Sequence, residues 1–251
     1  MSLQLNGPNE PVESYKEFYG PNNMQMSLLI ADGRTPLSSD GLMSRYLEVL
    51  RLHRDAPKEL KPAYTSVLKA WEDNHFDTGD GAPRHSDGRM KVVPDAHYLR
   101  ILTPETRLVG GAVDLSEIYT TLNVEEFSEA DVERYCGMPL SRSGAKKNPV
   151  WLALARGDKA LLGDFVDARF SRAKQLYGYK GKMMGVYAPP VPKEGEAGRL
   201  WAVYGLYGGI DGSWAGGSGR LDDNFGRLVV GAPEAQRAAQ QTLEQRVLVP
   251  Q

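Results

Sequence analysis

The sequence contains one cysteine, Cys136, among 251 residues. A single thiol excludes an intrachain disulfide and cannot supply the several thiolates of a structural zinc cluster. Stability must therefore come from a hydrophobic core, and a chain of this length is long enough to bury one. Because cysteine is among the most often buried residue types, we interpret Cys136 as a structural thiol and not as a reactive one.

Long hydrophobic runs are also missing. No segment approaches the roughly 20 apolar residues that a membrane-spanning helix needs. The first residues, MSLQLNGPNEPVESYKEF, have neither the basic start nor the apolar stretch of a signal peptide. We therefore expect no membrane contact and a cytoplasmic location.

Motifs that would name a reaction are absent as well. There is no GxSxG segment for serine catalysis and no GxGxxG segment between a strand and a helix. The segment Gly178–Lys182 (GYKGK) resembles a phosphate loop only superficially. Two residues separate its glycines where that loop needs four, and Met183 replaces the Ser or Thr that follows the Lys. The catalytic residues of any enzymatic activity are therefore unknown from the sequence.

The composition is that of an ordinary globular protein, with 41% hydrophobic and 25% charged residues. Helix-like and strand-like segments do not alternate regularly along the chain, which favours an α+β fold over a doubly wound sheet. We predict amphipathic helices with a small, mainly antiparallel C-terminal sheet. Residues 1–23, rich in Pro, Asn, Glu and Gly, are expected to form an extended arm, and residues 24–251 a single globular domain, with a subdivision near 140–148 as the alternative.

Local patterns place the individual elements. Strands are expected at 24–31 and 98–102, helices at 42–50 and 62–71, a loop at 73–89, C-terminal strands at 183–188, 199–207 and 226–230, and a polar helix at 235–247.

The clearest helix signals lie in the segment from Asn148 to Pro190. Asn148 followed by Pro149 indicates a helix start, since Asn caps free N–H groups and Pro is tolerated at the first helical position. Gly178 follows the last residue of the apolar stripe and is a plausible terminator. Upstream, Ser128 with acids after it predicts another helix start.

Positive charge is concentrated between Arg134 and Lys182, where eleven Lys or Arg face three Asp. The net charge there is +8 in a chain of −2, an asymmetry typical of a surface that faces a polyanion. Cations also alternate with aromatic residues, a combination that can hold phosphates while stacking on bases. The candidate contact residues are Lys146, Lys147, Arg169, Arg172, Lys174, Tyr177, Tyr179, Lys180 and Lys182. The alternative is an ordinary surface helix whose aromatic residues are core and whose cations are solvated.

A second candidate site is the segment 73–97, which holds three of the four histidines. Oxygen and imidazole ligands at two-residue spacing suit Mg, Mn, Ca or Zn, and the candidate ligands are Asp73, His75, Asp77 and Asp80. A calcium loop does not match, because Thr78 stands where the turn glycine belongs. The alternative is that these Asp and His residues are turn formers and solvated charge.

The stretch from Gly205 to Gly219 holds seven glycines, with Tyr204 and Trp214 beside them. Without a nucleotide-fold context, a β-hairpin with a long loop is the favoured interpretation.

Three functional hypotheses follow. The first is a binding or accessory protein that contacts nucleic acid or an acidic protein surface through the basic segment. The second is a metal-dependent hydrolase using the Asp/His segment, and only this one requires a cofactor, a divalent metal. The third is a self-assembling scaffold in which opposite charges join subunits, which would make the protein a homo-oligomer.

Overall fold

The computed structural model describes residues 3–11, 14–206 and 213–231. The helices are α1 (Asn22–Ala31), α2 (Ser39–Asp55), α3 (Lys61–Glu72), α4 (His97–Arg100), α5 (Glu129–Tyr135), α6 (Arg142–Ala145), α7 (Pro149–Leu154), α8 (Lys159–Tyr177) and the short 3₁₀ helix η1 (Tyr119–Thr121). The strands are β1 (Tyr15–Tyr19), β2 (His75–His85), β3 (Met90–Lys91), β4 (Val113–Asp114), β5 (Glu126–Phe127), β6 (Val186–Tyr187), β7 (Glu196–Tyr204), β8 (Ala215–Gly216) and β9 (Arg227–Gly231). The helix expected at 235–247 lies outside these residues.

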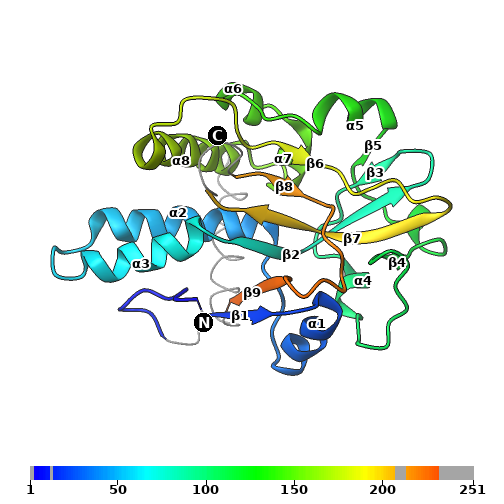
Figure 1. The fold of residues 1–251 in the computed structure, drawn as a ribbon, viewed down its shortest axis with the longest axis horizontal. Coiled ribbons are helices and arrows are strands. Elements are labelled where there is room, and N and C mark those ends of the chain that lie inside the picture. The colour runs from blue at the N-terminus through cyan, green and yellow to red at the C-terminus, as the bar shows by residue number, and fades with distance from the viewer. Residues whose placement is uncertain (1–2, 12–13, 207–212, 232–251) are drawn as a thin grey trace, which may run out of the picture.

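All nine strands belong to one mixed sheet, whose main order is β1-β9-β2-β7-β8-β6 (Figure 1). The long antiparallel pair of β2 and β7 forms its centre, while β2–β9 and β6–β8 are parallel pairs. The strands come from all parts of the chain. The expected α+β chain with a small, C-terminal antiparallel sheet is therefore wrong, since β1 and β2 come from the N-terminal third and belong to the same sheet, with β1 at its edge and β2 near its centre.

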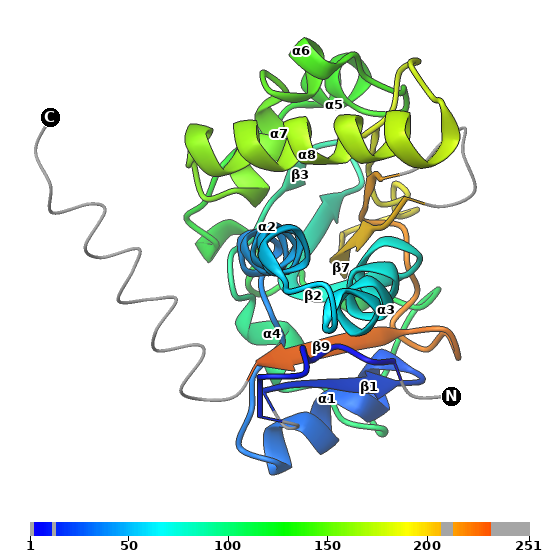
Figure 2. The same cartoon turned by 90° about the vertical axis from the view of Figure 1, so that its left-hand side faces the viewer.

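One face of the sheet is covered by α2, α3, α7 and α8. Its core holds Trp71, Trp151, Trp201 and Phe165, each no more than 2% exposed. The opposite face is covered by α1, α4 and the segment that carries η1, with Met26 among its buried residues. Figure 2 shows α8 and α1 on opposite sides of the sheet. We call the first the helix-covered face and the second the open face, because the second also carries the half-buried side chains of Tyr187, Tyr204 and Trp214.

Alternation along β7 assigns its side chains to the two faces, because successive side chains in a strand point in opposite directions. Trp201 and Val203 pack in the helix-covered core, whereas Leu200 and Ala202 pack in the core of the open face. Tyr204 follows the second pattern and packs against the open-face core while staying half-buried.

The capping signals are confirmed. The Asn148 side chain accepts hydrogen bonds from the N–H groups of Val150 and Trp151, with Pro149 as the first residue of α7. Gly178 ends α8 in the left-handed conformation with φ 65°. Ser128 and Asp131 form a reciprocal capping box at the start of α5.

Residues 24–31, expected as a strand, form most of α1. Good helix formers such as Met, Gln and Leu fill this segment, and Met26 and Leu29 lie on one helical face and are fully buried. The strand expected at 98–102 is likewise wrong, because residues 97–100 form α4.

The loop expected at 73–89 is instead mainly β2, whose interior is buried. Buried carboxylates are tolerated here because each has partners. Asp77 accepts from the side chain of Asn22 at 3.0 Å and from the N–H of Arg227 at 2.7 Å. A register shift between Asp77 and Gly81 marks a bulge, where the Thr78 hydroxyl donates to the Trp201 carbonyl at 2.7 Å.

Residues 1–23, expected as an arm, contribute β1, which pairs with β9. A subdivision near 140–148 stays a prediction. Among the described residues, no helix combines the length and apolar character required to cross a membrane.

Candidate binding site on the open face

Four ring side chains form a row across four neighbouring strands at one end of the open face. In sheet order they are His75 on β2, Tyr204 on β7, Trp214 immediately before β8, and Tyr187 on β6. Strand register brings them together, since His75 lies opposite Tyr204 and the Tyr204 N–H donates to the Trp214 carbonyl at 2.9 Å. We call these four residues the aromatic row.

The rings of the aromatic row contact one another directly. His75 and Tyr204 are stacked with centroids 5.2 Å apart, and Tyr204 and Trp214 are stacked at 4.4 Å. Tyr187 meets Trp214 edge-on at 6.1 Å and 82°. Such offset and edge-to-face arrangements are the favoured geometries of aromatic pairs. The packing of the four rings against one another therefore fixes their positions.

Small residues around the aromatic row make this packing feasible. A Cβ atom on Gly216 would lie 3.3 Å from the Tyr204 ring, and one on Gly217 would lie 2.8 Å from Pro189. Ser213, just before Trp214, has φ 64°, so the chain turns sharply into β8. The glycine-rich stretch thus serves as close packing for aromatic side chains where it is described, and the rest of its loop lies outside the described residues.

All four residues are half-buried, so part of each reaches solvent. The imidazole Nε2 of His75 is 3.0 Å from the Phe225 carbonyl. Within the described part of the chain, neither the Trp214 indole N–H nor the Tyr187 hydroxyl has a hydrogen-bond partner. Both groups can take part in hydrogen bonds.

Below His75 on the same strand lies the buried Asp77. Burial raises the pKa of Asp77, opposed by hydrogen bonds from the Arg227 N–H and the Asn22 amide and by the nearby His75. Its carboxylate oxygen serves two protein donors, so we assign Asp77 to the support of the site and not to ligand contact.

The four predicted metal ligands do not converge. Asp73 pairs with Lys69 on α3, His75 belongs to the aromatic row, and Asp77 is bound as described above. Asp80 accepts from Arg156 at 2.7 Å and from the Ser39 N–H at 2.8 Å. Within residues 3–11, 14–206 and 213–231, no group of three or more His, Cys, Asp or Glu side chains is placed to hold a metal ion.

The predicted polyanion-binding residues are divided between internal and exposed positions. Arg169 is 4% exposed, with its guanidinium 3.8 Å from the centroid of the Tyr46 ring. Arg172 binds the buried Glu72 at 2.6 Å, and Lys146 pairs with Asp167 at 2.6 Å. The exposed members are Lys147, Lys174, Tyr177, Lys180 and Lys182, and Tyr179 is half-buried.

Comparison with known proteins shows a similarity of fold alone. No family model matches the chain, and a search of curated proteins found no match. A solved structure described as "Accommodation of massive sequence variation in Nanoarchaeota by the C-type lectin fold" is similar, with a TM-score of 0.58 and 18% sequence identity. The likeness covers 87% of this chain and 98% of that one. The chain thus has a fold similar to the C-type lectin fold.

This likeness corrects the description of the chain as an alpha+beta nucleic-acid-binding protein, since the fold is sheet-rich and the similar structure gives no support for a nucleic-acid role. Whether the basic segment binds a polyanion, whether Asp73–Asp80 binds metal, and whether the chain self-assembles stay predictions. The aromatic row was missed because its members are far apart in sequence. The only available signal was the pair Tyr204 and Trp214 beside the glycines.

Proposed function

We propose that this chain is a carbohydrate-binding protein and that the aromatic row is its contact surface. One observation carries the proposal: four half-exposed rings pack against one another on adjacent strands, and the Trp214 N–H and the Tyr187 hydroxyl have no hydrogen-bond partner among the described residues.

The chemistry of the row suits a sugar. A sugar presents apolar C–H groups beside hydroxyls, and Tyr and Trp combine an apolar body with a polar tip. The Trp214 N–H can donate to a hydroxyl oxygen, and the Tyr187 hydroxyl can donate or accept. Because the stacked faces of Tyr204 and Trp214 are occupied by each other, a ligand would meet their edges and polar tips. Side chains already fixed by stacking lose little rotamer freedom on binding.

The row itself contains no Lys or Arg, so it offers rings and hydrogen-bonding groups but no permanent cation that would bind phosphates. The proposed ligand is therefore a neutral sugar. The fold adds support, because the similar solved structure is described by a C-type lectin fold that accommodates massive sequence variation.

The test begins with an array of neutral and acidic oligosaccharides and continues with titration of the best binder. Trp214 is the half-exposed tryptophan of the four, since Trp71, Trp151 and Trp201 are buried. A ligand on the aromatic row should therefore change tryptophan emission and protect it from a soluble quencher. We expect a neutral oligosaccharide to produce both effects.

Variants then locate the contact. Trp214→Ala should weaken binding by roughly tenfold or more, as expected for loss of an aromatic anchor. Tyr187→Phe removes only the hydroxyl and should weaken binding by a few-fold. The matched control is Tyr19→Ala, an exposed tyrosine on β1, outside the row. Binding of nucleic acid in place of sugars, or equal loss in the Tyr19 variant, would overturn the proposal.

A further inference from the structure

A hollow lies at the opposite end of β7 from the aromatic row. It has a volume of about 290 Å³ and lies between the segments 98–106 and 113–118. Strand β4 closes one side by pairing Val113 with Gly198, near the start of β7, whereas Tyr204 is the last residue of that strand. At about 3.3 Å per residue, the two sites are separated by roughly 20 Å, so they are distinct.

The floor of the hollow is apolar and firmly built. Tyr98, Leu102 and Leu115 are each at most 3% exposed, and the Tyr98 hydroxyl donates to the Arg199 carbonyl at 2.6 Å. A Cβ atom on Gly198 would lie 2.6 Å from Leu115 and 2.9 Å from Tyr98, so the glycine allows both side chains to pack against β7. The floor is therefore preformed.

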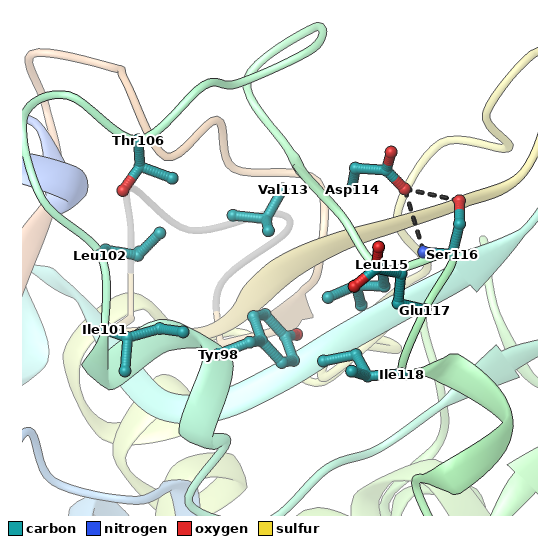
Figure 3. Close-up of a pocket in the computed structure, with 10 residues that line it drawn as sticks. All are labelled: Tyr98, Ile101, Leu102, Thr106, Val113, Asp114, Leu115, Ser116, Glu117 and Ile118. Atoms are coloured by element: carbon teal, nitrogen blue, oxygen red, sulfur yellow. Dashed lines mark hydrogen bonds between the residues drawn. The ribbon is translucent and has the colours of Figure 1, made fainter.

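The rim combines exposed apolar and acidic side chains. Ile101 is 61% exposed and Ile118 38%, although both line the same hollow. Figure 3 shows Ile101 and Leu102 on one side, with Asp114, Ser116 and Glu117 on the other. Apolar side chains that stay exposed around one hollow are typical of a binding site.

The acidic side chains at the rim have carboxylate oxygens without a partner among the described residues. One oxygen of Asp114 accepts from the Ser116 N–H at 3.0 Å and from the Ser116 hydroxyl at 2.6 Å, which leaves the other oxygen open. These hydrogen bonds, with a smaller effect of Arg107, lower the pKa of Asp114. Glu117 forms no ion pair with any described residue. The hollow therefore offers negative charge beside an apolar floor.

We infer that this hollow binds a small organic ammonium compound, with the apolar body between Ile101 and Ile118 above the buried floor and the ammonium group between Asp114 and Glu117. The inference does not depend on the proposed carbohydrate site, which lies at the other end of β7.

The experiment uses three probes of similar size on the full chain: 2-phenylethylamine, 2-phenylethanol and 3-phenylpropanoate. Binding is measured by saturation-transfer NMR and by titration calorimetry. We expect the amine to bind with a dissociation constant on the order of millimolar or better, the alcohol to bind roughly fivefold more weakly, and the carboxylate not to bind. Equal binding of the three probes, stronger binding of the carboxylate, or no binding of the amine would overturn the inference.

Matched variants assign the contacts. Glu117→Gln should weaken the amine roughly fivefold and leave the alcohol unchanged, while Ile118→Ser should weaken both. The controls are Glu133→Gln, an exposed acid on α5, and Leu28→Ser, a 55% exposed apolar residue on α1. If the controls weaken the amine as much as the site variants, the assignment is wrong. Thermal melts confirm that each variant is folded.

Discussion

The two faces of the sheet carry some of the same residue types in different environments. On the helix-covered face, Trp71, Trp151 and Trp201 are sealed under α2, α3, α7 and α8. On the open face, Trp214 is half-exposed in the aromatic row, and Ile101 is exposed at the rim of the hollow between residues 98–106 and 113–118. Because alternate residues of β7 serve opposite faces, one strand contributes both to the core and to the contact surface. Both faces thus contribute a buried core, and the proposed contact surface lies on one of them.

Two tryptophan truncations test the difference between buried and half-exposed tryptophans, and we expect them to have the largest effect on the free energy of unfolding. Trp151 is fully buried, and its N–H donates to the Met184 carbonyl at 2.9 Å. Trp151→Ala should lower the free energy of unfolding by about 3–5 kcal/mol, since it leaves a cavity and an unpaired carbonyl. Trp214→Ala should cost about 1 kcal/mol, because half-exposed residues lose less contact. Chemical denaturation measures both, and similar losses would contradict the comparison.

A charge variant on the helix-covered side should have the next largest effect. Arg172 on α8 binds both oxygens of the buried Glu72 at 2.6 and 2.9 Å, and the Tyr46 hydroxyl donates to the same carboxylate at 3.2 Å. Arg172→Met leaves a buried carboxylate without its cation and should destabilise the protein by about 3 kcal/mol. Lys174→Met, an exposed change on the same helix, is the control and should have little effect on denaturation.

A smaller effect is expected from pH. Burial alone raises the pKa of Glu10, but hydrogen bonds from Arg45 and from the Gly7 N–H outweigh it, so the folded-state pKa falls below the ordinary 4.5. A lowered pKa stabilises the fold above the unfolded-state value, and this contribution is lost as pH falls through the folded-state value.

Glu10→Gln should therefore lower the melting temperature at neutral pH and flatten its decline in acid. Glu48→Gln is the control, because Glu48 contacts the same Arg45 but is 44% exposed. A decline in acid that is unchanged by Glu10→Gln would show that this ion pair does not contribute.

Local chemistry explains which parts of the fold were predictable. Asn148, Ser128 and Gly178 satisfy helix ends through bonds to residues a few positions away, so sequence spacing is sufficient to find them. The strand β2 was hidden because its carboxylates Asp77 and Asp80 are satisfied by residues far away in the sequence. The spacing of residues along the sequence does not indicate partners that are so far away.

The candidate site was less predictable than the fold for the same reason. His75, Tyr187, Tyr204 and Trp214 become neighbours only through the order of four strands and their register. The basic segment showed the opposite error: its charge was visible in the sequence, but the burial of Arg169 and the pairing of Arg172 depend on α2 and α3, which pack beside α8.

The position of β9 in the sheet affects the order in which the protein folds. This strand lies between β1 and β2, pairing Tyr15 with Gly231 and Leu228 with Asp77, so among the described strands β1 joins the sheet through β9 alone. Contacts between such distant parts of the chain form slowly, because a large loop must close first. During synthesis, β1 would lack its partner strand β9 until residues 227–231 had left the ribosome. We therefore expect the closure of the sheet to be among the last steps of folding.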